Sequence, residues 1–202
     1  MPIRLPHAAA ALALSAAVCV PATALAGPMT PGERQRLVAH LEMTERWLGQ
    51  ELDGLSDAQL TFKPAPDRWS IKDVVEHLAI AEPQYWTQLE SSLKAPVKDG
   101  WKPQATDEQM LWYGIDRTNR QKTGEARVPH GERSAKESLA SFRKLRATML
   151  EKAKTSQEDF RTRPFLDSAQ DIYQWFLMIS THSQRHILQI LEVKADPNYP
   201  KK

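Results

Sequence analysis

Apolar side chains recur at three- and four-residue steps in four stretches of the chain, which is the spacing of one face of an α-helix. The first stretch opens with Thr30-Pro31-Gly32-Glu33, which supplies an N-cap, a proline at the first helical position and a capping-box acid. This helix should end near Asp53-Gly54, because glycine accepts the left-handed conformation that closes a helix. Its apolar face is predicted to contain Leu37, Leu41, Trp47 or Leu48, and Leu52.

A long connection follows the second predicted helix. That helix opens at the capping box of Ser70 and Asp73 and ends before the prolines and glycine of segment 96–103. In the connection, residues 95–133, the helical spacing of apolar residues is interrupted, except in a short helix predicted at 106–118. A connection of this length inside a compact domain commonly serves as a crossover or as a lid over a site.

Two more helices complete the predicted fold. Ser134 and Glu137 form the capping box of the third helix, and Asp167 or Ser168 caps a fourth helix that runs to about residue 195. No stretch alternates apolar and polar residues as a surface strand would, so no sheet is expected. The pattern predicts an all-α fold, a four-helix bundle with a long crossover connection between helices 2 and 3.

The N-terminus has the features of a secretory signal peptide over residues 1–26. Arg4 precedes an apolar run, Pro21 interrupts it, and residues 24–26 supply the small-x-small pattern of a cleavage site. An uncleaved membrane anchor is the alternative. We expect cleavage to leave one domain, residues 27–202, that is periplasmic or secreted and has no membrane attachment.

Composition narrows the chemistry of the mature chain. Its single cysteine, Cys19, lies inside the predicted leader, which leaves no thiol for disulfides, thiolate zinc sites or cysteine nucleophiles. Any metal must therefore be held by His, Asp or Glu. The 27 basic and 25 acidic residues are interspersed, and no dense basic stripe indicates nucleic-acid binding.

The inward-facing seam of the fourth predicted helix contains polar residues where a core helix would be apolar. His182 and His186 are one turn apart, so both side chains can reach a common ion, and Gln189 continues their line as a hydrogen-bonding group. Two buried imidazoles are costly unless each ring nitrogen finds a partner, which a metal supplies. The seam consists of Ile172, Trp175, Ile179, His182, His186, Gln189 and Val193.

A third ligand has two candidates. His77 lies one turn from the apolar positions of the second helix, and His40 lies similarly in the first helix. Periodicity does not decide between them. His130 lies in a loop with proline and glycine and is a poor candidate.

Two short motifs carry a family resemblance. The stretch RWSIKDVVEHL at 68–78, followed by HSQRHILQI at 182–190, resembles the paired signatures of the DinB-like (YfiT-like) metalloprotein superfamily. The resemblance spans nearly the whole mature chain. It implies a four-helix bundle that binds a divalent metal ion through His77, His182 and His186, which selects His77 over His40, and it suggests a homodimer.

Three imidazoles leave an open metal position for water or a small-molecule substrate, which is typical of catalytic sites. Imidazole ligands suit zinc, nickel, iron or copper, so the sequence does not identify the ion. We expect a metal-dependent hydrolase, or a thiol transferase like some superfamily members, although export removes the chain from the cytosolic thiol pool. The alternative is a non-catalytic helical module of the cell envelope that binds a ligand or partner.

The catalytic residues stay unassigned at this stage. Glu76, Glu82 and Tyr85 on the second helix are candidates for a general acid or base, although charged helix residues usually face solvent. Tryptophans could line an apolar pocket or lie exposed on the connection as a contact surface. The pocket candidates are Trp69, Trp86 and Trp175, and the connection carries Trp101, Trp112 and Tyr113.

Overall fold

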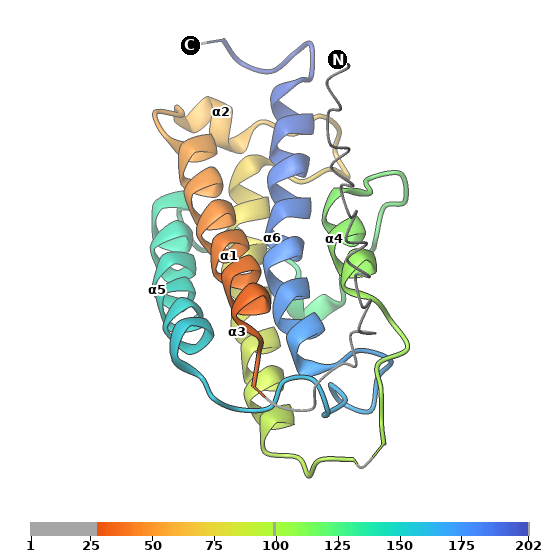
Figure 1. Ribbon diagram of the computed structural model, residues 1–202. Coiled ribbons are helices and arrows are strands. Elements are labelled where there is room, and N and C mark those ends of the chain that lie inside the picture. The colour runs from red at the N-terminus through yellow and green to blue at the C-terminus, as the bar shows by residue number, and fades with distance from the viewer. Residues whose placement is uncertain (1–27, 99, 202) are drawn as a thin grey trace, which may run out of the picture.

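The computed structural model describes residues 28–98 and 100–201, and within them it is helical apart from two isolated backbone bridges. The predicted signal peptide lies outside the described residues. Four long helices form the predicted bundle, and three short helical segments lie in the connections (Figure 1). The long helices are α1 (Pro31–Leu52), α3 (Ile71–Leu93), α5 (Ala135–Thr155) and α6 (Ile172–Lys194), and the short ones are α2 (Asp57–Thr61), α4 (Asp107–Ile115) and η1 (Glu125–Arg127).

The bundle places consecutive long helices on diagonals. Both α1 and α3 pack against α5 and α6, so α1 lies diagonally across from α3, and α5 from α6. In Figure 1, α1 and α6 run in one direction while α3 and α5 run in the other. Helices α3 and α6 therefore pack side by side, although residues 94–171 separate them in the chain.

Capping boxes define the helix starts as the sequence predicts for the first three long helices. Thr30, Ser70 and Ser134 each accept a backbone hydrogen bond from the third residue of the helix, whose acidic side chain bonds back to the cap. The end of α1 is also confirmed, because Gly54 follows it with a left-handed φ of 64°.

The predicted start of the fourth helix was wrong. Leu166 and Asp167 adopt left-handed backbone conformations, with φ of 46° and 56°, which no α-helix start accommodates. Asp171 is the N-cap instead, and its carboxylate accepts the Gln174 backbone N–H at 2.6 Å. The fourth helix therefore begins at Ile172.

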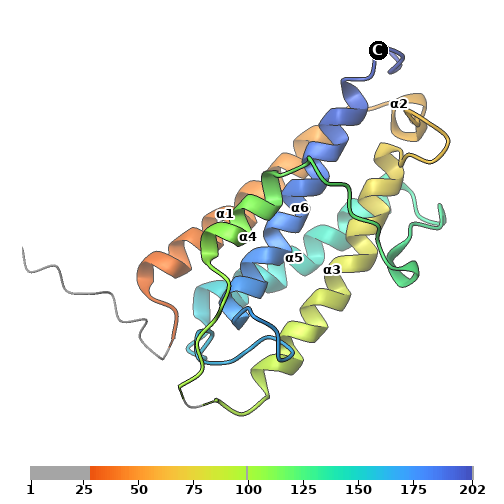
Figure 2. The ribbon, with the colours of Figure 1, turned by 90° about the vertical axis from the view of Figure 1, so that its right-hand side faces the viewer.

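The predicted crossover connection joins α3 to α5 and contains both α4 and η1. Figure 2 shows α4 lying along α6, outside the bundle of long helices. The close approach depends on Gly114, where an added Cβ would lie 2.9 Å from the Thr181 Cβ. The connection thus forms a fifth wall beside α6.

Buried side chains form two apolar clusters, one toward each end of the bundle. Between them lie buried polar groups from several helices, including Thr44, Glu82, Arg146 and Ser183. None of the helices in the described part of the chain combines the length and apolar character that crossing a membrane requires.

Candidate metal centre

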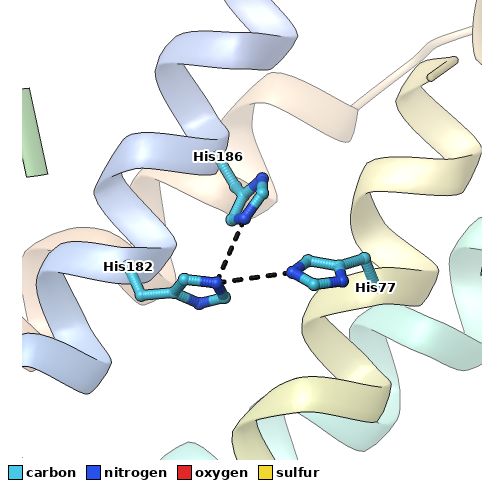
Figure 3. A group of neighbouring side chains, drawn as sticks. All are labelled: His77, His182 and His186. Atoms are coloured by element: carbon cyan, nitrogen blue, oxygen red, sulfur yellow. Dashed lines mark hydrogen bonds between the residues drawn. The ribbon is translucent and has the colours of Figure 1, made fainter. Parts of the chain in front are cut away.

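Three histidines from two helices converge between α3 and α6 (Figure 3). His182 and His186 are adjacent on one face of α6, and His77 reaches them from α3. The His182 Nε2 atom lies 3.4 Å from Nε2 of His77 and 3.1 Å from Nε2 of His186. The structure thus brings together the three residues that the sequence proposes as metal ligands.

Neighbouring acceptors set the tautomers of two of these rings. The Nδ1–H of His77 donates to the Arg127 carbonyl at 2.7 Å, and the Nδ1–H of His186 donates to the Gln189 side-chain oxygen at 2.9 Å. Both Nε2 atoms therefore present lone pairs toward the centre of the group. The predicted hydrogen-bonding role of Gln189 is confirmed.

The arrangement of the three Nε2 atoms is better explained by coordination of a divalent cation than by hydrogen bonds among the three rings. A hydrogen on the His182 Nε2 could serve only one of the two neighbouring lone pairs, so the other lone pair would have no partner without a cation. Tetrahedral ligands at zinc–nitrogen distances of 2.0–2.1 Å lie about 3.3 Å apart, close to the separations seen here. The arrangement suggests a divalent metal ion.

Burial keeps the imidazoles in the neutral form that binds metal. Burial lowers the pKa of His182 and of His186 well below the usual 6.5, and the other two histidines add to the effect on His182. Burial also lowers the pKa of His77, although the Arg127 carbonyl opposes the shift. Protons therefore compete poorly with a metal ion for these nitrogens at neutral pH.

Aromatic rings flank the histidines. The Trp69 ring lies 4.8 Å from that of His77 and 6.2 Å from that of His186, and the Tyr85 ring meets His182 edge-on at 5.2 Å. Of the predicted pocket tryptophans only Trp69 faces the site. Two others pack elsewhere, with Trp86 against Phe176 in the core and Trp175 against Phe165.

A cavity of about 600 Å³ opens above the three histidines. This volume suits a small organic molecule. Residues of the connection form one side of it, including half-buried Tyr113, whereas Trp112 is exposed on the outer side of α4. The predicted role of the connection as a wall of a site agrees with this arrangement.

Both glutamate candidates for acid–base chemistry are engaged in structural contacts. Buried Glu76 accepts the backbone N–H groups of Gly131 and Glu132 at 2.8 and 3.1 Å, which anchors the connection to α3. Glu82 is buried beside Arg146 rather than exposed as its charge suggested. Tyr85 is the one candidate of the three that lines the cavity.

The remaining histidine candidates lie outside the group. The ring of His40 hydrogen-bonds to Ser180 at 2.8 Å and to Gln184 at 3.2 Å, which satisfies both nitrogens without a metal. His130 is exposed in the connection. Within the part of the chain that the structure describes, no fourth His, Cys, Asp or Glu joins the three histidines.

Sequence reasoning missed two arginines at the site. The carbonyl of Arg127 orients His77, and Arg185 donates to the Tyr113 carbonyl at 3.2 Å and to the carbonyl of Asp116. Both roles depend on contacts between α3 or α6 and the irregular connection. Helical periodicity carries no signal for such contacts.

Comparisons with known proteins agree with this geometry. The chain is similar to the uncharacterised protein YuaE of Bacillus subtilis (strain 168), at 30% identity over 158 residues that cover 74% of this chain and 91% of YuaE. It also resembles the solved structure of YfiT from Bacillus subtilis, described as a probable metal-dependent hydrolase with an unusual four-helix bundle topology. That match has a TM-score of 0.55 and 19% identity, covers 85% of this chain and 91% of YfiT, and shows the shared fold. The family model of the DinB superfamily matches residues 36–190. The chain belongs to the DinB superfamily.

Proposed function

We propose that this protein is a metal-dependent hydrolase that holds a divalent ion through His77, His182 and His186. The proposal rests on one observation: the Nε2 atoms of three neutral imidazoles converge at the base of a cavity that can admit a substrate. When bound, the ion would supply Lewis acidity for a substrate oxygen and for an attacking water. The description of YfiT as a probable metal-dependent hydrolase supports the same reaction class.

The chain's own groups supply position and protons around that ion. Trp69 and Tyr85 exclude bulk water from two sides of the histidines. Burial raises the pKa of the Tyr85 hydroxyl, so this group keeps its proton at neutral pH and can donate a hydrogen bond to a substrate oxygen. Gln189 and the Arg127 carbonyl keep the histidine rings in the orientation that ligation needs.

Metal analysis of the purified mature protein tests the proposal. We expect near-stoichiometric zinc, nickel or iron in the parent protein and in His40→Ala, and none in His182→Ala. Equal metal content in parent and His182→Ala would show that the ligands are wrongly assigned. Absence of metal from the parent after addition of divalent ions would favour the non-catalytic binding module instead.

Thiol transfer is the competing reaction for the same site. An assay panel separates the two, with activated esters and amides on one side and low-molecular-weight thiols with electrophiles on the other. We expect metal-dependent turnover of the first group without added thiol. Turnover that requires a thiol would reassign the protein as a transferase.

We also propose that residues 1–26 direct export and are removed. The support is the charge, apolar run and small-residue pattern of this segment. Mass spectrometry of the protein from a periplasmic extract should give a chain that begins at Gly27. A chain that retains the segment and fractionates with membranes would support the anchor alternative.

A further inference from the structure

The cavity above the histidines is lined by positive charge. Only one carboxylate, Asp67, lies among its lining residues, and Glu192 nearby pairs with Arg117 at 2.8 Å and with Arg68 at 3.8 Å. Two lining cations thus share a single carboxylate. The lining cations are Arg68, Arg117, Arg120, Lys122, Arg127 and Arg185.

Four of these cations form no salt bridge with a carboxylate within the described ranges 28–98 and 100–201. Arg120 and Lys122 are exposed at the cavity wall. Arg185 is buried and donates to backbone carbonyls, which satisfies its N–H groups, while its charge acts on the Asp116 carboxylate without forming a salt bridge. Arg127 is the fourth.

Arg127 lies beside the histidines. Its guanidinium carbon is 5.1 Å from the Tyr85 ring centroid, and that ring in turn meets His182 at 5.2 Å. Its backbone carbonyl accepts from His77, which fixes the residue against the site. The Arg127 Nε is buried and has no hydrogen-bond partner. A planar guanidinium that lines a cavity, with one buried donor unpaired, is suited to a carboxylate or phosphate group.

Charge balance points the same way. Imidazole ligands add no negative charge, so a divalent ion would bring its full charge into a cavity that is already positive. Cations gathered around one cavity repel each other unless an anion joins them. The protein side offers too few carboxylates to do this, which leaves the ligand as the source of negative charge.

We infer that the cavity binds small molecules that carry a carboxylate or phosphate group, held by Arg127 with Arg120 and Lys122, while the group to be cleaved faces the histidines. The inference rests on the proposed function and specifies its substrate class. It predicts that the anionic group binds even when no metal is present, because the cations belong to the chain itself.

Metal-free protein tests the inference separately from the metal site. After chelator treatment, benzoate and phenylphosphonate serve as anionic probes and benzamide as a neutral probe of the same shape as benzoate. Binding is followed by NMR titration at low and at high salt. We expect both anions to bind, benzamide to bind about tenfold more weakly or worse, and the anion affinities to fall with salt.

Matched variants locate the anion. Arg127→Met should weaken benzoate and phenylphosphonate binding by about tenfold, and Arg127→Lys should recover part of it. Arg46→Met, which removes an equal charge from an exposed position on α1, should change these affinities less than about twofold. Equal binding of benzoate and benzamide, or no effect of Arg127→Met, would overturn the inference.

Zinc affinity, measured with a competing chelator dye, distinguishes a failure of the anion-binding inference from a failure of the proposed function. The Arg127 charge disfavours positive charge at His77 and His182, so Arg127→Met should bind zinc as tightly as the parent or more tightly. Intact zinc binding without anion binding would remove the substrate class and leave the metal site. If Arg127→Met loses zinc as well, the double variant Arg120→Gln/Lys122→Gln decides, and unchanged anion affinity there would reject the inference.

Discussion

At the scale of single residues, the hydrogen bond between His186 and Gln189 determines which nitrogen can bind a metal. The Gln189 oxygen accepts the Nδ1–H of His186 at 2.9 Å and leaves Nε2 free to ligate. Partners of this kind orient the ligand and raise its basicity, and their loss commonly costs about 10- to 100-fold in metal affinity. Gln189 lies on the cavity rather than in the core, so its replacement should affect binding more than folding.

We therefore predict that Gln189→Leu lowers zinc affinity by about tenfold or more, as measured by competition with a chelator dye. Gln184→Leu is the matched control, because Gln184 bonds to His40 outside the site. The control should bind zinc like the parent. Similar losses in both variants would mean that the tautomer of His186 does not limit binding.

At the scale of helices, the start of α6 gathers three carboxylates around one guanidinium. Arg161 contacts Glu33 at 2.6 Å, Asp107 at 2.7 Å and Asp171 at 2.8 Å. Arg36 also acts on Asp107, and Asp171 is the most buried of the three acids. Burial raises the pKa of Asp171 to about 6, although Arg161 opposes the shift.

This shift predicts a measurable pH dependence of stability. The unfolded chain has the ordinary Asp pKa of 3.8, so between about pH 6 and pH 4 the folded protein binds more protons at this residue. The contribution of Asp171 to the free energy of unfolding therefore rises as pH falls through this window. The position does not titrate in Asp171→Asn, whose amide oxygen can still cap α6.

Urea unfolding of metal-free parent and Asp171→Asn at pH 7 and pH 4.5 checks this prediction. The stability of the parent relative to the variant should increase by on the order of 1 to 2 kcal/mol on acidification. Titrating groups outside the Arg161 cluster act equally on both proteins and cancel in the difference. A constant difference across the range would show that Asp171 keeps an ordinary pKa.

The helices themselves could be predicted from the sequence because their signals are local. Capping boxes and helical spacing placed α1, α3 and α5, and the two histidines one turn apart marked the α6 half of the site. The prediction of the α6 start was wrong because two other capping residues, Asp167 and Ser168, precede Asp171. Only the tertiary contact with Arg161 distinguishes Asp171 from these two residues.

At the scale of the whole molecule, the sequence could not predict which distant residues meet. Helical spacing left His77 and His40 equivalent, and the family resemblance selected His77; the structure separates them because α1 and α3 lie on different sides of α6. The same limit hid the buried polar layer, in which Glu82 of α3 contacts Arg146 of α5 at 3.0 Å and also Ser183 of α6. Glu82, which the sequence pattern placed on a solvent-exposed helix face, thus connects three helices.

This layer gives a prediction about stability. Both Glu82 and Arg146 are essentially inaccessible to solvent, so removing one leaves a buried charge without its partner. We expect Glu82→Leu to lower the free energy of unfolding by about 3 to 5 kcal/mol, and Glu82→Leu/Arg146→Met to recover most of the loss. The exposed pair of Lys154 and Glu42 provides the control, where Glu42→Ala should cost less than about 1 kcal/mol.

The double variant also separates stability from site geometry. Ser183 donates to Glu82 and directly follows His182, a proposed metal ligand, so the layer contacts α6 next to the candidate site. If the layer only stabilises the bundle, Glu82→Leu/Arg146→Met should fold and bind zinc like the parent. If the layer also positions His182, the folded double variant should bind zinc more weakly than the parent. A double variant that unfolds at lower urea than Glu82→Leu, or without a cooperative transition, would contradict the expected recovery of stability. Chemical unfolding and zinc competition on the same four proteins, parent, two single variants and the double variant, give the coupling between Glu82 and Arg146 for each property separately.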